Sequence, residues 1–276
     1  MYNSKIIQNM KIIGYSERGA MNALFYGMAL DKEHGEESMK AFINDLAKIE
    51  GDFSDFELYN EFSLSEFGDP DMIIMAKDEK GEKIVFFIEA KRSGFKLSLE
   101  KEHHKQYMKN GDFENGHSSN LFFQLRLKHY FFEVFCRKRK DDYYNSLEDK
   151  IEAFFKKECF KVYDEMQLSK LKKSKNRNRT IGENVVVNHI VEQIKDCIEA
   201  YYIAIIPEQD PKLNDNEANT DEFGFSTITL TWERIYNYKE YDFKTYLKDT
   251  IEFNQGKDRN KKEKSQILNY PEKDCK

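Results

Sequence analysis

The stretch GDPDMIIMAKDEKGEKIVFFIEAKRSG, residues 68–94, decides the fold. Its two apolar runs, MIIMA and IVFFI, flank the charged segment DEKGE, and this pattern predicts an antiparallel β-hairpin. If Lys77 pairs with Lys83 across the turn, counting outward along both strands places Asp71 opposite Glu89. This register is an assumption, because a shift by one residue would turn Asp71 to the other face of the sheet.

Two acids that face each other across a hairpin indicate a cation. The Cβ atoms of directly opposed residues lie about 4.5–5.5 Å apart, and like charges at that distance repel. A divalent cation would reverse the sign of this interaction, and carboxylate oxygens are ligands that suit Mg²⁺ and Mn²⁺. Lys91 lies two residues after Glu89, so both side chains leave the strand on the same face. The hairpin therefore predicts a metal site of the kind that hydrolyses phosphodiesters.

Periodic apolar patterns predict the remaining elements of an α/β fold. Helices are expected within residues 16–31, with Ser16 as N-cap, and within 36–51, 118–139, 183–199 and 240–253. Strands are expected within residues 56–68, 70–77, 82–91, 201–208 and 225–235. The polar residues between the hairpin and the helix at 118–139 are given no element bounds. His103 and His104 among them are expected to be exposed helix residues, because no spaced partner completes a zinc set.

Pro70-Asp71, an apolar strand, and Glu89-Ala90-Lys91 at the end of the next strand resemble the signature of the PD-(D/E)xK, or restriction-endonuclease-like, nuclease superfamily. The order of elements is also similar to the αβββαβ core of that family, with a mixed central sheet flanked by helices. The resemblance implies that Asp71 and Glu89 ligate the metal, that the Ala90 carbonyl adds a ligand, and that Lys91 serves the attacking water. It extends from about residue 16 to about residue 235 and identifies no subfamily.

The context of the Glu89-Ala90-Lys91 triplet makes it informative, whereas the triplet alone does not. Other triplets with the same spacing occur in this charged chain, such as Asp78-Glu79-Lys80 and Glu148-Asp149-Lys150. The triplet at 89–91 ends an apolar strand and follows Pro70-Asp71 across a hairpin. We therefore place the candidate site there.

Two further residues are candidates for the site, and each has a second interpretation. Glu17 lies in the first helix in line with its apolar stripe, and several members of the family place a helix-1 acid at the metal; an acid in a first helical turn also favours the helix dipole. Gln124 resembles a glutamine that some members use near the metal or phosphate. It could equally be a boundary residue with its amide in solvent, and the QxxxY pattern of one branch is absent because position 128 is lysine.

A basic run is the candidate nucleic-acid contact. It consists of Lys170, Lys172, Lys173, Lys175, Arg177 and Arg179, and such a run can neutralise phosphates without reading sequence. A solvated loop is the alternative. We assign residues 1–255 to one nuclease-like domain, with a charged, partly helical insertion at about 140–184 and a flexible tail at 256–276.

The composition of the chain argues against several classes of protein. The chain has 276 residues, of which 39% are hydrophobic and 34% are charged, and its formal net charge is −6, which argues against a general polyanion binder. The four cysteines form no CxxC pair, so neither a zinc ribbon nor a disulfide framework is indicated. No apolar run suits a signal peptide or a membrane span. We expect a cytoplasmic protein without a membrane partner.

The leading hypothesis is a Mg²⁺-dependent nuclease, with Mn²⁺ as a substitute, that cleaves DNA and uses Asp71, Glu89 and Lys91 with Glu17 and Gln124 in support. The choice of DNA over RNA rests on family analogy. The alternative is a nuclease-fold module that binds nucleic acid or assembles with protein without cleaving. Cleavage mode, sequence specificity and a homodimeric state stay open.

Overall fold

The computed structural model of the protein describes residues 12–13, 16–60, 62–64, 67–92, 95–110, 120–136, 185–208, 219–221 and 224–255. The chain divides into two compact units. Unit 1 comprises Met1–Phe56, Ala90–Lys96 and Ile203–Lys276, and unit 2 comprises Glu57–Glu89 and Leu97–Tyr202. Strands β1, β3 and β4 cross the unit boundaries, so each unit is described by itself.

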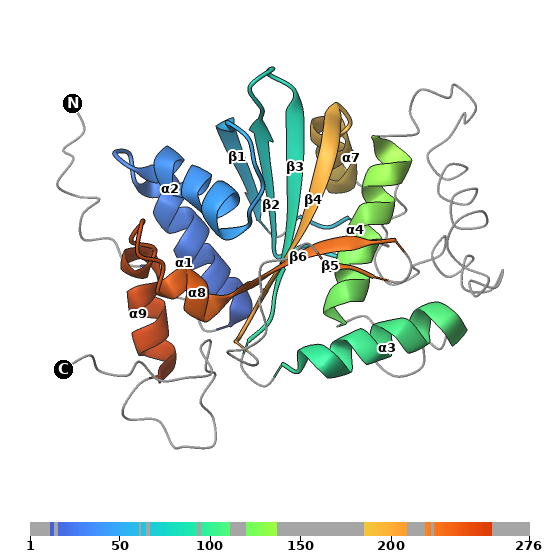
Figure 1. Ribbon diagram of the computed structural model, residues 1–276. Coiled ribbons are helices and arrows are strands. Elements are labelled where there is room, and N and C mark those ends of the chain that lie inside the picture. The colour runs from blue at the N-terminus through green and yellow to red at the C-terminus, as the bar shows by residue number, and fades with distance from the viewer. Residues whose placement is uncertain are drawn as a thin grey trace. The chain divides into compact units, whose positions relative to one another are not determined.

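Within the described residues, six strands follow the order β1-β2-β3-β4-β6-β5 (Figure 1). Their bounds are β1 (Ser54–Asn60), β2 (Met72–Lys77), β3 (Lys83–Ala90), β4 (Cys197–Ile206), β5 (Asn219–Thr220) and β6 (Ser226–Thr231). The pairs β2–β3 and β5–β6 are antiparallel, whereas β4 and β6 are parallel. The predicted α/β class with a mixed sheet flanked by helices is confirmed.

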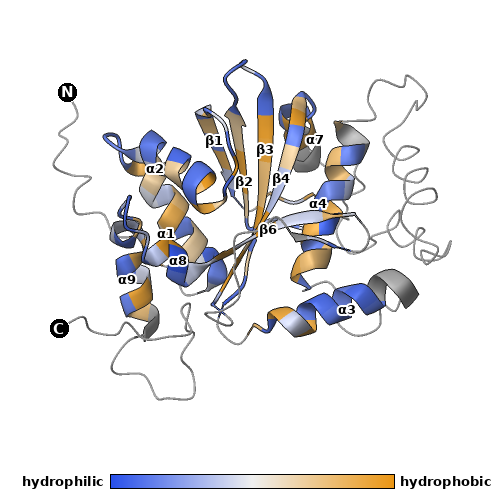
Figure 2. Ribbon diagram, in the orientation of Figure 1, coloured by the Kyte–Doolittle hydropathy of each residue, from blue (hydrophilic) through white to orange (hydrophobic). Residues whose placement is uncertain are grey.

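The two strands of the hairpin are buried on both faces. Met72–Ala76 of β2 and Ile84–Ala90 of β3 are buried without a break, and both strands are hydrophobic along most of their length in Figure 2. Exposure in β1 instead alternates along its first residues, as expected for a strand at the edge of a sheet. The continuous apolar runs therefore place the hairpin in the interior of the sheet. The acids at its outer end, Asp71 and Glu89, are buried as well.

Unit 2 places a buried helix against the hairpin. Its helices are α3 (Leu97–Asn110), α4 (Leu121–Phe135) and α7 (Val185–Ile194). Helix α4 begins after Asn120, whose Oδ1 accepts a hydrogen bond of 3.0 Å from the Phe123 N–H. Phe131 of α4 meets Phe87 of β3 edge-on, with ring centroids 6.4 Å apart. This contact aligns α4 with β3 and turns the middle of the helix toward the hairpin.

Unit 1 contains the helices α1 (Glu17–Leu30), α2 (Gly35–Ala41), the π-helical segment η2 (Phe42–Leu46), α8 (Trp232–Tyr236) and α9 (Lys244–Gln255). Ser16 caps α1 as predicted, because its hydroxyl accepts a hydrogen bond from the Gly19 N–H at 3.4 Å. The predicted apolar face of α1 is fully buried. Helix α9 runs close to α1: a Cβ added to Gly27 would lie 2.6 Å from Cδ1 of Tyr246.

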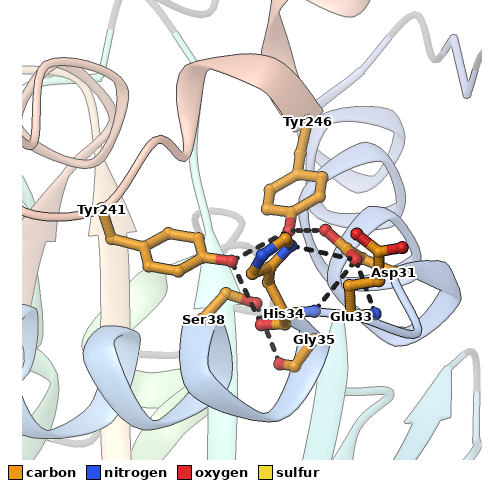
Figure 3. A network of polar contacts seen from close by, with 7 residues as sticks. All are labelled: Asp31, Glu33, His34, Gly35, Ser38, Tyr241 and Tyr246. Atoms are coloured by element: carbon orange, nitrogen blue, oxygen red, sulfur yellow. Dashed lines mark hydrogen bonds and ion pairs between the residues drawn. The ribbon is translucent and has the colours of Figure 1, made fainter.

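A polar network joins the end of α1 to α9 in unit 1 (Figure 3). The Tyr246 hydroxyl donates to Oδ2 of Asp31 at 2.8 Å, and the Tyr241 hydroxyl donates to the His34 carbonyl at 3.1 Å. Burial alone would raise the pKa of Asp31. Hydrogen bonds from Tyr246 and from the N–H groups of His34 and Glu33 outweigh it and hold the pKa below the ordinary 3.8.

Several predicted elements differ from the structure. The segment after the hairpin contains helix α3, of which only His103 and His104 were expected to be helical. Helix α7 ends at Ile194, three residues before β4 begins, rather than near residue 199. The predicted strand at 225–235 ends at Thr231, where the Thr231 hydroxyl accepts from the Arg234 N–H and starts α8. The insertion at about 140–184 and the tail at 256–276 lie outside the described residues.

Candidate active site

The hairpin register that positions the two acids is the predicted one. Lys77 pairs with Lys83, and the pairing continues without a bulge to Met72 and Ile88. One further step in the same register brings Asp71, directly before β2, opposite Glu89 of β3. Both residues are buried, with 8% of Asp71 and 2% of Glu89 exposed. The predicted register is therefore present as far as Met72 and Ile88, and its continuation by one step would set the two buried acids opposite each other at the outer end of the hairpin.

The side chain of Lys128 in α4 contacts Glu89 at this end of the hairpin, and the sequence analysis did not predict this contact. Its Nζ lies 2.6 Å from Oε1 of Glu89, and the two side chains are 0% and 2% exposed. Each charge would be strongly unfavourable if it were buried alone, so the two groups depend on each other. The ion pair shows that the Glu89 carboxylate attracts a cation into the interior of unit 2.

The turn before β2 is shaped around the Lys128 ammonium. Gly68 has a φ of +79°, a conformation that favours glycine. A Cβ at this position would also lie 3.1 Å from Nζ of Lys128. The turn is closed by the Leu64 N–H, which donates to the Gly68 carbonyl at 3.1 Å. A side chain at position 68 is therefore disfavoured in two ways, by the positive φ of the backbone and by the nearby ammonium of Lys128.

Gln124 lies on the same helix as Lys128, one turn earlier. Residues four apart share a helical face, and Gln124 is half-buried whereas Lys128 is fully buried. Its backbone is fixed at the helix start, since its N–H donates to the Asn120 carbonyl at 2.9 Å. The role of the Gln124 side chain stays a prediction.

Lys91 belongs to unit 1, where its main chain is held on both sides. The Lys91 N–H donates to the carbonyl of Ile205 in β4 at 2.8 Å, and the Lys91 carbonyl accepts from Nε1 of Trp232 at 2.9 Å. Trp232 is fully buried, so it is a core residue of unit 1. The indole also fixes the backbone of the candidate lysine, and nothing in the sequence indicated this contact.

Glu17 also lies in unit 1, near the residue that follows Lys91. Its Oε2 is 3.9 Å from Nε of Arg92, and the side chains are 32% and 49% exposed. Helix α1 therefore brings its first-turn acid to the end of the Glu-x-Lys strand. A surface pair of this kind contributes little to stability, and Glu17 remains a candidate through its position.

The residues at the hairpin fit a divalent cation in their chemistry. Asp71 and Glu89 offer oxygen ligands of the type that Mg²⁺ prefers, and the ammonium of Lys128 already shows where a positive charge is drawn. Among the residues that the structure describes, no three or more His, Cys, Asp or Glu side chains gather as a metal-binding group. A metal here would therefore complete its shell with the predicted Ala90 carbonyl, waters or substrate oxygens.

Two other predictions concern residues away from the hairpin. The basic run, Lys170, Lys172, Lys173, Lys175, Arg177 and Arg179, lies outside the described residues and stays a prediction. The expectation that His103 and His104 are both exposed is wrong for His104, which is 5% exposed. Its Nε2 accepts from Nε of Arg126 at 3.2 Å, and this contact ties α3 to α4 in unit 2.

The interior position of Lys128 had a signal in the sequence. Helix α4 reads LFFQLRLKHYFFEVF, which is apolar on nearly all sides, so a central lysine had to be buried with an acid. The helix pattern alone did not indicate which acid would pair with it.

No family model matches the chain, and neither a curated protein nor a solved structure shows a significant similarity to it. Within the described part of the chain, no helix has both the length and the apolar content needed to cross a membrane.

Proposed function

We propose that the protein is a divalent-metal-dependent nuclease of the PD-(D/E)xK type that hydrolyses phosphodiester bonds in DNA. The observation that carries the proposal is the hairpin register, which, continued one step beyond Met72 and Ile88, sets the two buried acids Asp71 and Glu89 opposite each other. A hairpin selected only for stability would avoid this pair. The resemblance of Pro70-Asp71 and Glu89-Ala90-Lys91 to the family signature supports the same function and the restriction-endonuclease-like core.

Each candidate residue has a defined task in this proposal. Asp71, Glu89 and the Ala90 carbonyl hold Mg²⁺ or Mn²⁺, and the bound ion supplies Lewis-acid stabilisation of the charge that develops on the phosphate. Lys91 orients the attacking water, and the fixed main chain on both sides of Lys91 limits the range that its amine can sample. Glu17 and Gln124 are supporting residues.

Cleavage assays with matched variants test the proposal. Linear and circular, single- and double-stranded DNA, and RNA, are incubated with the protein in Mg²⁺, Mn²⁺ or EDTA. We expect cleavage of DNA only with a metal, and loss of it in Asp71→Asn and Lys91→Ala at unchanged thermal stability. Lys80→Ala is the control, because Lys80 ends a triplet of the same spacing in the exposed turn. Full activity in Asp71→Asn or Lys91→Ala would refute the assignment.

The Lys128–Glu89 ion pair favours a second candidate function. A buried ammonium on a candidate ligand could replace the metal permanently, and the protein would then be a nuclease-fold module that binds nucleic acid or protein without cleaving. This candidate predicts association that is indifferent to Mg²⁺ and EDTA. Metal-dependent cleavage excludes it.

A further inference from the structure

We propose that the Lys128 ammonium is a built-in counter-ion of Glu89 that competes with the divalent cation and so sets the metal affinity of the site. The inference rests on the proposed function, since it takes Asp71 and Glu89 as the metal-binding pair. It goes beyond that function by assigning a role to a residue outside the family signature. The metal-free protein would keep Glu89 neutralised without an ion from solution.

The distance between the two charged groups makes competition unavoidable. Nζ of Lys128 lies 2.6 Å from Oε1 of Glu89, and Mg²⁺ binds its oxygen ligands at about 2.0–2.1 Å. An ion on the same oxygen would therefore lie at most about 4.7 Å from the ammonium. Repulsion at that distance is strong where water is excluded. The ammonium must either move away or weaken the binding of the metal.

The surroundings of Lys128 allow the ammonium to move away from Glu89. Apart from Gly68 and its two neighbours in the chain, the one atom of the described residues within 4 Å of the position that a Gly68 Cβ would occupy is Nζ of Lys128. Gly68 is half-buried and the next residue, Asp69, is exposed and acidic, so this turn leads from the buried pair to the surface. The lysine side chain has a flexible four-carbon stem. We infer that the ammonium shifts toward this turn when a divalent cation binds.

Metal-binding measurements without nucleic acid test the inference directly. Mn²⁺ affinity is measured by electron paramagnetic resonance of the free ion, and Mg²⁺ affinity by calorimetry, for the wild type, Lys128→Met and the charge-conserving Lys128→Arg. We expect Lys128→Met to bind Mn²⁺ at least about tenfold more tightly than the wild type, and Lys128→Arg to stay close to it. Equal or weaker binding by Lys128→Met, including no binding by any form, would overturn the inference.

Thermal unfolding checks that the variant reports on charge. Lys128→Met leaves Glu89 buried without its counter-ion, so its Tm in EDTA should fall and should rise more on addition of Mn²⁺ than that of the wild type. The double variant Glu89→Gln/Lys128→Met removes both charges. We expect it to regain much of the lost Tm in EDTA and to respond little to Mn²⁺. A Tm response of Lys128→Met no larger than that of the wild type would contradict the competition.

A measurement on the unaltered fold covers the case in which Lys128→Met does not fold. The NH₃⁺ group of a buried, ion-paired lysine exchanges slowly enough for detection by ¹H–¹⁵N NMR, and Lys128→Arg assigns the signal by its loss. Saturating Mg²⁺ should shift or remove this signal, and an unchanged signal would refute the displacement.

The two proposals fail in different ways. If Lys128→Met binds metal more tightly but no form of the protein cleaves DNA, the counter-ion role stands and the nuclease function does not. If the wild type cleaves DNA while Lys128→Met has unchanged metal affinity, the nuclease function stands and the counter-ion role does not.

Discussion

The Glu89 carboxylate and the Lys128 ammonium are both removed from water, and neither group tolerates burial alone. Replacing both partners of a buried ion pair by apolar residues is often neutral or stabilising, whereas removing one partner costs about 3–5 kcal/mol. Stability therefore does not explain why a lysine and a glutamate occupy these two positions. The proposed metal site would supply a reason for charge at the end of the hairpin.

Asp31 offers a pH-dependent test at the level of a single residue. Because its pKa is lowered in the folded protein, the contribution of Asp31 to stability is present above its unfolded pKa of about 3.9. It disappears as the pH falls through the lower folded value. Tyr246→Phe removes the 2.8 Å hydrogen bond to the carboxylate. We expect it to reduce the free energy of unfolding by about 1–2 kcal/mol at pH 7.

Urea denaturation between pH 7 and pH 3 measures this difference. The gap between wild type and Tyr246→Phe should narrow below about pH 4, because protonated Asp31 no longer benefits from the donated hydrogen bond. The Asp31 pKa, followed by NMR of its carboxyl carbon, should rise in the variant. A gap that is independent of pH would show that the hydroxyl stabilises through another contact, such as the Tyr241 hydroxyl at 3.4 Å, and not through the Asp31 carboxylate.

At the scale of elements, the close approach of α1 and α9 depends on the absence of one side chain. An alanine Cβ at position 27 would lie 2.6 Å from Cδ1 and 2.9 Å from Cβ of Tyr246. Such a contact forces the helices apart, and overpacking costs about 1–3 kcal/mol. Alanine has a better helix propensity than glycine, which offsets about 1 kcal/mol of this cost. We expect Gly27→Ala to destabilise unit 1 by up to about 2 kcal/mol.

A double-mutant cycle identifies the cause of this loss. If the clash with Tyr246 is responsible, Gly27→Ala in a Tyr246→Ala background should be neutral or stabilising by calorimetry. The same loss in both backgrounds would point to another neighbour of Gly27.

The hairpin and α1 could be predicted because their signals are local. A turn between two apolar runs fixes the register, and a serine before an amphipathic stretch fixes a helix start. The extent of helix α3 was missed because its sequence, LSLEKEHHKQYMKN, has little apolar periodicity, and it is largely hydrophilic in Figure 2. Its buried His104 binds Arg126 of α4, and a contact between two helices is not encoded in either segment alone. For the same reason, the sequence of α4 did not indicate that Lys128 pairs with Glu89.

At the scale of the whole molecule, the candidate residues are divided between the two units. Asp71, Glu89 and Gln124 belong to unit 2, whereas Glu17 and Lys91 belong to unit 1. The chain passes from one unit to the other between Glu89 and Ala90, within the Glu-x-Lys triplet itself.

The basic run supplies a prediction about the whole protein in solution. With a formal net charge of −6, binding to DNA requires a local concentration of positive charge. Replacing Lys170, Lys172, Lys173, Lys175, Arg177 and Arg179 by glutamine should weaken DNA binding. If all six contact phosphates, the slope of log Kobs against log salt should become less steep by about five.

Fluorescence anisotropy with a labelled duplex in a salt series measures both quantities. Replacing Lys80 and Lys83, which lie at the turn of the hairpin, by glutamine is the control and should leave the salt slope close to that of the wild type. An unchanged slope in the sixfold variant would show that the run does not contact phosphates.

The hydrogen bond between Trp232 and the Lys91 carbonyl has a practical consequence. Trp232 is the only tryptophan of the chain, so the tryptophan emission of the protein comes from one indole, whose N–H is bound to the backbone of the candidate lysine. Its wavelength and lifetime respond to the polarity and hydrogen bonding of that single position. The native protein thus carries an optical probe, without any label, of the segment in which we expect ions and nucleic acid to act.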